Sequence, residues 1–355
     1  LCHVLVEDTY LSGAYDLKLE DLYPVDDSGR FIFQPSEALR NYLEPYVPSS
    51  SMTTPVRMAN AFKRFQVRFA ERYGTPPVPQ ALYTYGPYMA HLAGRDEYRR
   101  TKYDDWSDDL DNNSSLRQFL SNWQNTTAKR EKSITPAQRE FLAFVVPSGG
   151  HTAIRLYCTI YYTDYTKLQN YILYSYSSSP AEGEMLLFNS GIKPRGLDGF
   201  FASKTISHYE LWCGNQSGTQ LSEKRYYRVN YQRNEIARYW HFLNSRGGWD
   251  TLLLTGEIEQ DLQVDVQHSE RHVPFAPSNH YDARDNADVL RNVDIPTKSA
   301  LLWLYRDEVH AIADLFASEC IIERTGNQHV PIVLTERKAK LVDEGSDRVA
   351  IPVKY

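Results

Sequence analysis

Apolar and polar residues alternate along several stretches of the chain, with the period of two that places every second side chain of a strand on one face. The stretches are residues 65–69, 154–162, 227–231 and 262–266, with a shorter one at Tyr209–Trp212. Each predicts a strand that buries one of its faces. Because they occur in every third of the chain, the sequence predicts a mainly β protein.

Turn signals rich in glycine, asparagine and serine separate these stretches. They stand at residues 27–29, 148–150, 214–215, 246–248, 325–327 and 343–345. Such spacing is typical of antiparallel sandwiches and not of βαβ units. We therefore predict serial antiparallel β-sandwich domains of the immunoglobulin or fibronectin type III-like kind, with a few short helices.

One short helix is predicted near residue 36. Ser36 is placed to cap it and Pro45 to end it. Its apolar residues are Leu39, Tyr42 and Leu43. We expect this helix to pack on a sheet.

A second helix is predicted from apolar residues at helical spacing near the end of the chain. The stripe comprises Tyr305, Val309, Ile312 and Phe316, with Asp307 and Glu308 in the first turn, where acidic groups suit the helix dipole. We expect Ile312 and Phe316 to be structural core residues. The stripe should lie on a sheet formed by the last strands, residues 330–335 and 349–353, while Arg306 and His310 face water.

Composition shifts divide the chain of 355 residues, for which roughly 100–200 residues per domain predict two or three domains. Residues 101–133 are polar and charged, which indicates a linker. A new apolar run begins at Trp240. We expect an N-terminal β-rich domain with a short helix and a polar linker over residues 1–130, a central β-sandwich domain over 131–235, and a C-terminal β domain with one packed helix over 236–355.

Charge and cysteine usage narrow the classes of function. The net charge is -6 and the 39 basic residues are spread along the chain, so we expect no nucleic-acid partner. No run approaches the ~20 apolar residues of a membrane-spanning helix, so we expect no membrane insertion. The four cysteines form no CxxC pair, which predicts reduced thiols and no zinc ribbon.

Motifs of common active sites do not occur in the sequence. His268 and His272 have the H-x3-H spacing of metal ligands on a helix, but they continue a strand pattern and no clear third ligand accompanies them. The acidic run over residues 104–111 has the wrong spacing for a calcium loop and suits a solvated linker. We therefore predict no catalytic, cofactor-binding or metal-binding residues, and no enzyme activity.

Tyrosine is unusually frequent, with 26 residues in the chain. Its rigid apolar ring and polar tip suit both sheets and interfaces. The segment Tyr157–Tyr176 could offer ring faces to sugars or bases, but its alternation favours a role in the core and in interfaces. The sequence therefore predicts aromatic-rich contacts with partner proteins.

The segment Arg238–Thr251 reads RYWHFLNSRGGWDT and is followed by LTGE at residues 254–257. Together with residues 27–33 before 39–43, and residues 308–318 before 330–335, it resembles segments of large structural proteins encoded by bacteriophages and prophages of Bacteroides-like bacteria. The resemblance spans most of the chain and brings no catalytic residues. It implies a virion protein of the tail or another appendage, assembled in the cytoplasm of the bacterial host.

Within this segment, Gly247 and Gly248 permit a tight turn with unusual backbone angles, and Trp249 supplies a large apolar anchor. We expect all three to be structural, with Trp249 buried. The leading hypothesis is a structural component of a phage particle that acts by assembly with other virion proteins and with copies of itself, as a homo-oligomer.

Three alternatives stay open. One is a carbohydrate-binding adhesin or receptor-binding module for a host-surface glycan, which would present a Trp or Tyr platform in a groove. Another is a tailspike-like glycosidase, which needs two carboxylates in a cleft. A viral capsid shell protein of a different type is the third.

Overall fold

The computed structural model describes most of the chain. The described residues are 1–9, 12–22, 33, 35–49, 51–73, 75–76, 78–92, 116–123, 125–192, 204–232, 237–254, 258–261, 264–271, 285–293, 297–305, 309–325, 328–335 and 348–355, and over residues 258–312 only the backbone is described. Strands hold 50% of the residues and helices 4%, which confirms the prediction of a mainly β protein.

The largest sheet is mostly antiparallel and has the strand order β11-β10-β13-β14-β8, with β14 and β8 parallel. Its strands are β8 (Lys132–Ile134), β10 (Ile154–Tyr162), β11 (Lys167–Tyr176), β13 (Ile206–Asn215) and β14 (Arg225–Val229). A three-stranded antiparallel sheet of order β3-β12-β9 shares a core with it, which we call the first core. The strands of this smaller sheet are β3 (Val56–Arg57), β9 (Phe141–Val145) and β12 (Met185–Asn189).

The three-stranded sheet is covered on both faces, because every residue of β9 and β12 is buried. Phe144 and Phe188 belong to the first core. Phe141 and Leu187 belong to a second core on the opposite face. The sheet is therefore an inner layer of the body.

A four-stranded sheet of order β16-β15-β21-β22 lies across the second core. Its strands are β15 (Arg238–Leu243), β16 (Trp249–Leu254), β21 (Ile321–Thr325) and β22 (Gln328–Ile332). Leu243 and Trp249 pack in the second core, whereas Trp240 and Phe242 pack in a third core on the other side. Because successive side chains of β15 point to opposite faces of its sheet, this strand contributes residues to both cores.

The third core is closed by the helix α4 (Val309–Ala317) and by a sheet of order β17-β20-β23. That sheet consists of β17 (Ile258–Asp261), β20 (Thr297–Tyr305) and β23 (Arg348–Lys354). Leu315 is fully buried there and Phe316 is partly buried against the same core, in keeping with the predicted packing of Phe316. The side chain of Ile312 lies outside the described residues.

Two expectations for this region are wrong. Tyr305 does not belong to the helix, because it ends β20 and pairs with Arg348, so the helix begins four residues later. The last strands also do not form one sheet, since β22 pairs with β21 and β23 pairs with β20. Arg306, Asp307 and Glu308 lie outside the described residues, as does the side chain of His310.

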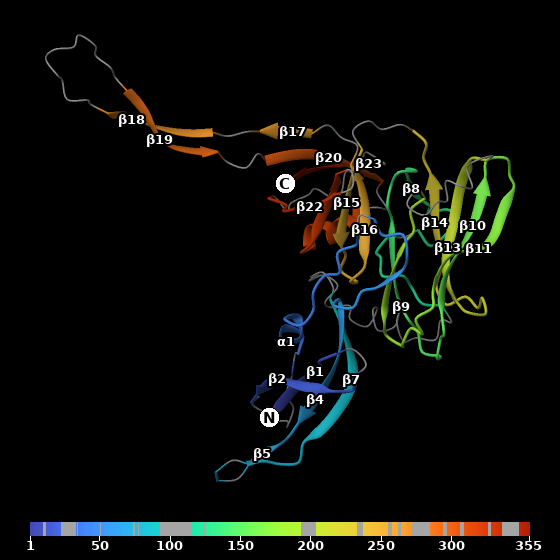
Figure 1. Ribbon diagram of the computed structural model, residues 1–355, viewed down its shortest axis with the longest axis vertical. Coiled ribbons are helices and arrows are strands. Elements are labelled where there is room, and N and C mark those ends of the chain that lie inside the picture. Colours follow the sequence, from blue (N-terminus) through green and yellow to red (C-terminus); the bar gives the residue numbers. More distant parts are fainter. Residues whose placement is uncertain are drawn as a thin grey trace.

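The N-terminal part forms a sheet of order β2-β1-β4-β7 that extends downward from the body in Figure 1. Its strands are β1 (Cys2–Glu7), β2 (Tyr15–Asp21), β4 (Phe62–Phe69) and β7 (Tyr83–His91), and the short strands β5 (Arg72–Tyr73) and β6 (Val78–Pro79) pair near its tip. The helix α1 (Ser36–Arg40) packs Leu39 against Val4 and Val6.

The helix α1 is shorter than predicted. It ends at Arg40 with Asn41 as its C-cap, so Tyr42 and Leu43 lie beyond it. Pro35, and not Ser36, occupies the N-cap position, where no side-chain hydrogen bond is made. Proline suits this place because its fixed φ starts a helix without using a backbone N–H.

A two-stranded hairpin projects from the body at the upper left of Figure 1. It consists of β18 (Val264–Arg271) and β19 (Asp285–Val293), which pair antiparallel with a register shift beside His268. The predicted strand at 262–266 is thus observed from Val264 onward, and His268 lies on it. His272, the second histidine of the H-x3-H pair, lies outside the described residues.

The predicted polar linker is packed into the body over residues 116–123, whereas residues 126–130 are exposed. Phe119 lies in the first core, Leu120 in the second and Trp123 in the third. Each is at most 7% exposed. A segment that contributes side chains to three cores within five residues holds these cores together. The acidic run at 104–111 lies outside the described residues.

Candidate functional site

The segment with the strongest sequence motif forms the turn between β15 and β16. Gly247 has a φ of +85°, and a Cβ there would lie 2.4 Å from the carbonyl oxygen of Leu92. A Cβ on Gly248 would lie 1.9 Å from the carbonyl oxygen of Leu120. Both glycines are therefore required by the close approach of two other chain segments.

Asn244 holds this turn together. Its Oδ1 accepts hydrogen bonds from the backbone N–H groups of Arg246 and Gly248, each at 3.0 Å. Its Nδ2 donates to the carbonyl oxygen of Leu120 at 2.8 Å and to Asp250 at 2.9 Å. Asp250 in turn accepts a hydrogen bond of 2.6 Å from the hydroxyl of Ser121. The turn thus holds residues 120 and 121 in place through the hydrogen bonds of Asn244 and Asp250.

Trp249 is 1% exposed in the second core, which confirms the prediction that it is buried. Its indole Nε1 donates a hydrogen bond of 2.7 Å to the carbonyl oxygen of Tyr46. Through Tyr46, Leu92 and Leu120 the turn contacts the N-terminal part of the chain at three points. We call this arrangement the β15–β16 junction. The contacts of its residues stabilise the fold.

Three tyrosines form a row on the surface of the N-terminal sheet. Tyr83, Tyr85 and Tyr88 of β7 are 65%, 51% and 48% exposed. They lie opposite Phe69, Val67 and Phe65 of β4, which places them on one face. Two rings of β4 pack beside them, with centroids 5.8 Å apart for Phe69 and Tyr85 and 5.6 Å apart for Phe65 and Tyr88.

This tyrosine row lies on the last strand of its sheet as described, so the outer edge of β7 pairs with no described strand. Pro87 interrupts that edge because it has no backbone N–H to donate. Pairing of an unrelated strand with the outer edge of β7 is therefore disfavoured. The row can instead contact a partner through ring faces and hydroxyl groups.

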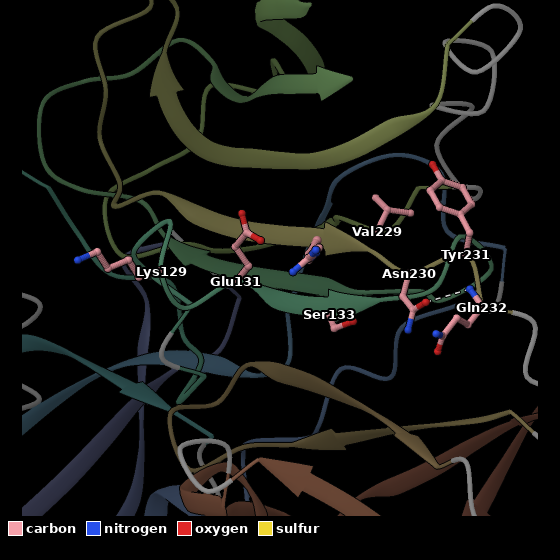
Figure 2. Close-up of a pocket in the computed structure, with 8 residues that line it drawn as sticks. Lys129, Glu131, Ser133, Val229, Asn230, Tyr231 and Gln232 are labelled. Carbon is pink, nitrogen blue, oxygen red and sulfur yellow. Dashed lines mark hydrogen bonds between the residues drawn. The ribbon is translucent and has the colours of Figure 1, made fainter. Parts of the chain in front are cut away.

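An open depression of about 790 Å³ lies along the edge formed by β8 and β14 (Figure 2). Figure 2 shows Lys129 and Glu131 at one end and Tyr231 and Gln232 at the other. The Tyr231 hydroxyl donates to the carbonyl oxygen of Ile206 at 2.9 Å. Glu131 is the one carboxylate among the eight lining residues, so this depression does not supply the carboxylate pair of a glycosidase.

The tyrosine-rich segment Tyr157–Tyr176 is divided between the interior and the surface. Tyr157 stacks on Trp212 with ring centroids 4.2 Å apart, and Tyr174 is 4% exposed in the first core. Tyr165 is 99% exposed. The segment therefore does not form a continuous ring platform.

The cysteines are free thiols, as predicted. Burial raises the pKa of the Cys158 thiol well above its ordinary value, and the nearby Glu210 carboxylate raises it further. A thiol with so high a pKa is not a reactive nucleophile. In the part of the chain that the structure describes, no three His, Cys, Asp or Glu side chains converge as a metal site, and no helix is long and apolar enough to span a bilayer.

Comparison of the chain with family models, curated proteins and solved structures gave no match. Two surface features of the chain are suited to contact other molecules, the projecting β18–β19 hairpin and the tyrosine row on β7.

Proposed function

We propose that this chain is a structural subunit of a phage particle, of its tail or another appendage, and that it acts by assembling with neighbouring subunits. The observation that supports this function best is the β18–β19 hairpin, which projects from the body (Figure 1). The phage setting follows the resemblance carried by the Arg238–Thr251 segment.

A hairpin of this kind is poorly suited to stand alone. Its two strands pair only with each other among the described elements. Two-stranded hairpins are marginally stable in water unless a third strand or a packed surface supports them. A neighbouring subunit can provide that support by adding a strand to an open edge or by covering a face.

The body has the rigidity that a subunit of fixed geometry needs. Three cores separate its layers, and the 116–123 segment contributes a side chain to each of them. The projecting sheet and hairpin are thus attached to a well-ordered base. Because this base is ordered before subunits meet, its residues lose little conformational entropy on association, which favours regular assembly.

Deletion of the hairpin tests the proposal. Asp261 of β17 pairs with Thr297 of β20, so a short Gly-Ser turn can replace residues 264–293 without breaking that pairing. We expect the intact chain to form a defined oligomer by native mass spectrometry, and the deletion variant to be monomeric with an unchanged melting temperature. A matched control removes the β5–β6 tip, residues 72–79, and should keep the oligomer.

Three results would contradict the proposal. One is an intact chain that stays monomeric at the highest soluble concentration. Another is a deletion variant with the same oligomeric state as the intact chain. Loss of folding in the deletion variant would also count against it, because the hairpin is proposed to contribute to association and not to the cores.

Glycan binding is a second candidate function, favoured by the tyrosine row. Exposed ring faces are suited to stacking against the C–H faces of a sugar. The paired substitution of Tyr83 and Tyr85 to Ala should abolish binding of a host-surface glycan measured by calorimetry, while Tyr165→Ala serves as the exposed control. Equal affinity in both variants would exclude the row as the glycan site.

A further inference from the structure

One end of the second core changes from apolar to cationic. The face of β15 and β21 that carries Leu243 and Ile322 in the core continues with His241 and Arg324. His329 lies beside Arg324 on the neighbouring strand β22. Arg139 lies in the segment before β9, a strand that packs in the second core opposite β15 and β21. We call Arg139, His241, Arg324 and His329 the cationic cluster.

The imidazole of His241 lies at the centre of this cluster and is 0% exposed. Its Nδ1 is 2.8 Å from the hydroxyl of Thr251, and its ring centroid is 5.8 Å from that of His329. The ring also meets the edge of Phe141, with centroids 5.1 Å apart. The tautomer in which Nδ1 accepts from the Thr251 hydroxyl carries its proton on Nε2 and presents a donor to the cluster.

Several buried nitrogen atoms of the cluster have no hydrogen-bond partner in the described chain. They are Nε2 of His241, Nε2 of His329, and Nε and Nη1 of Arg139. Arg139 is only 8% exposed. Buried donors of this kind are nearly always satisfied in folded proteins, and an unpaired buried guanidinium is more costly than an unpaired amide. The cluster therefore resembles a binding site in which the buried donors bond to an acceptor on a separate molecule.

The electrostatics agree with this view. Burial lowers the pKa of Arg139 to about 10, and the neighbouring charge of Arg324 lowers it further. Burial lowers the pKa of His329, as do the charges of Arg139 and Arg324. Burial also lowers the pKa of His241, and the charges of His329, Arg324 and Arg139 lower it further. Arg139, His241 and His329 thus each feel positive charge from at least one other member of the cluster.

The carboxylate that follows Arg139 in the sequence is already paired. Glu140 follows Arg139 in the chain, but its carboxylate accepts a hydrogen bond of 2.8 Å from the buried ammonium of Lys132. It also accepts a hydrogen bond from the side-chain amide of Gln138. Glu140 is therefore committed to Lys132 and Gln138.

We propose that the cationic cluster binds a small oxyanion, of the class of phosphate, sulfate or a carboxylate. The guanidinium of Arg139 would provide the forked contact that such anions prefer, with the two imidazoles completing it. Arg324, which donates to the carbonyl oxygen of Ala137 at 3.4 Å, contributes its charge. The partly buried His329 and Arg324 leave an approach from solvent. This site does not depend on assembly and goes beyond the proposed function.

Thermal unfolding of the full chain tests the site in phosphate, sulfate and acetate, each against chloride at equal ionic strength. We expect phosphate or sulfate to raise the melting temperature with a saturating dependence on concentration, as a ligand that binds only the folded state must. A larger effect of acetate would assign a carboxylate as the natural ligand. Because charge-assisted hydrogen bonds are the strongest of their kind, Arg139→Gln should weaken binding at least about tenfold.

Three further variants make the result decisive. His329→Gln should weaken binding as well, which covers the case in which Arg139→Gln does not fold. Arg155→Gln is the matched control, since Arg155 lies apart from the cluster and donates to the carbonyl oxygen of Gln216. His241→Gln should weaken binding without changing the oligomeric state. A rise that follows ionic strength alone, or full binding by the folded Arg139→Gln variant, would overturn the proposal.

Discussion

Removing the side chain of Trp249 should loosen the attachment of the N-terminal part of the chain to the body. The indole is 1% exposed and packs in the second core. Truncation of a buried Trp to Ala costs roughly 3–5 kcal/mol through lost burial and the cavity left behind. The carbonyl oxygen of Tyr46 also loses its donor, which adds about 1 kcal/mol if water does not replace it. We therefore expect Trp249→Ala to lower the free energy of unfolding by about 4–6 kcal/mol.

Urea unfolding followed by circular dichroism measures this loss, and Trp249→Phe divides it. Phe keeps most of the apolar volume but cannot donate to Tyr46, so its cost should be about 1–2 kcal/mol. Proteolysis adds a local readout, because the segment around Tyr46 should be cleaved faster in Trp249→Ala than in Trp249→Phe. A loss below about 1 kcal/mol in Trp249→Ala would refute the assignment of this residue as a core anchor.

Three further predictions concern other buried or half-buried residues. Gly248→Ala should destabilise the fold by roughly 3 kcal/mol or more, since its Cβ would lie 1.9 Å from the carbonyl oxygen of Leu120, and a normal melting temperature would contradict that geometry. Burial lowers the pKa of His91 to about 4, so below pH 6.5 the unfolded state takes up a proton that the folded state does not. Stability should fall by about 3 kcal/mol between pH 6.5 and 4, and His91→Asn should remove that part of the slope in pH-dependent urea unfolding. Lys132→Met leaves the charge of Glu140 buried and should cost about 3–5 kcal/mol, much of it recovered when Glu140→Gln is added in a double-mutant cycle.

Alternation identified strands that have one apolar face and missed strands that are apolar throughout. The prediction over residues 154–162 matches β10, although Tyr157 and Thr159 on its second face are also buried. In contrast, FLAFV at β9 and MLLFN at β12 are continuous apolar runs, because both faces of their sheet are buried. Such a run does not distinguish a strand from a buried helix. The inner layer of the body was therefore not predictable from periodicity.

The 116–123 segment shows a different limit. Leu116, Phe119, Leu120 and Trp123 have the i, i+3, i+4, i+7 spacing of a helix face, but the segment is not helical. Phe119, Leu120 and Trp123 instead enter three different cores, so their places are set by three distant parts of the chain. Local composition predicted a solvated linker, and only tertiary packing reverses that conclusion.

The surface features depend on distances in space that the sequence does not contain. Tyr83, Tyr85 and Tyr88 share a face because a register shift between β4 and β7 compensates for the extra residue at Gly86–Pro87. Strict alternation would place Tyr88 on the opposite face. The cationic cluster likewise joins residues 139, 241, 324 and 329, which no motif connects. The burial of Trp249, by contrast, was predicted from its place beside two glycines.

The β15–β16 junction connects the strongest motif of the sequence to the proposed function. Met58, Leu120, Phe141 and Trp249 all pack in the second core, although the composition assigns them to three successive domains. A chain joined in this way presents its tyrosine row and its hairpin from one packed base. If the hairpin mediates assembly as proposed, its position depends on this base, so mutations at the junction should weaken association as well as stability. We therefore expect the junction to act on assembly through the geometry it maintains.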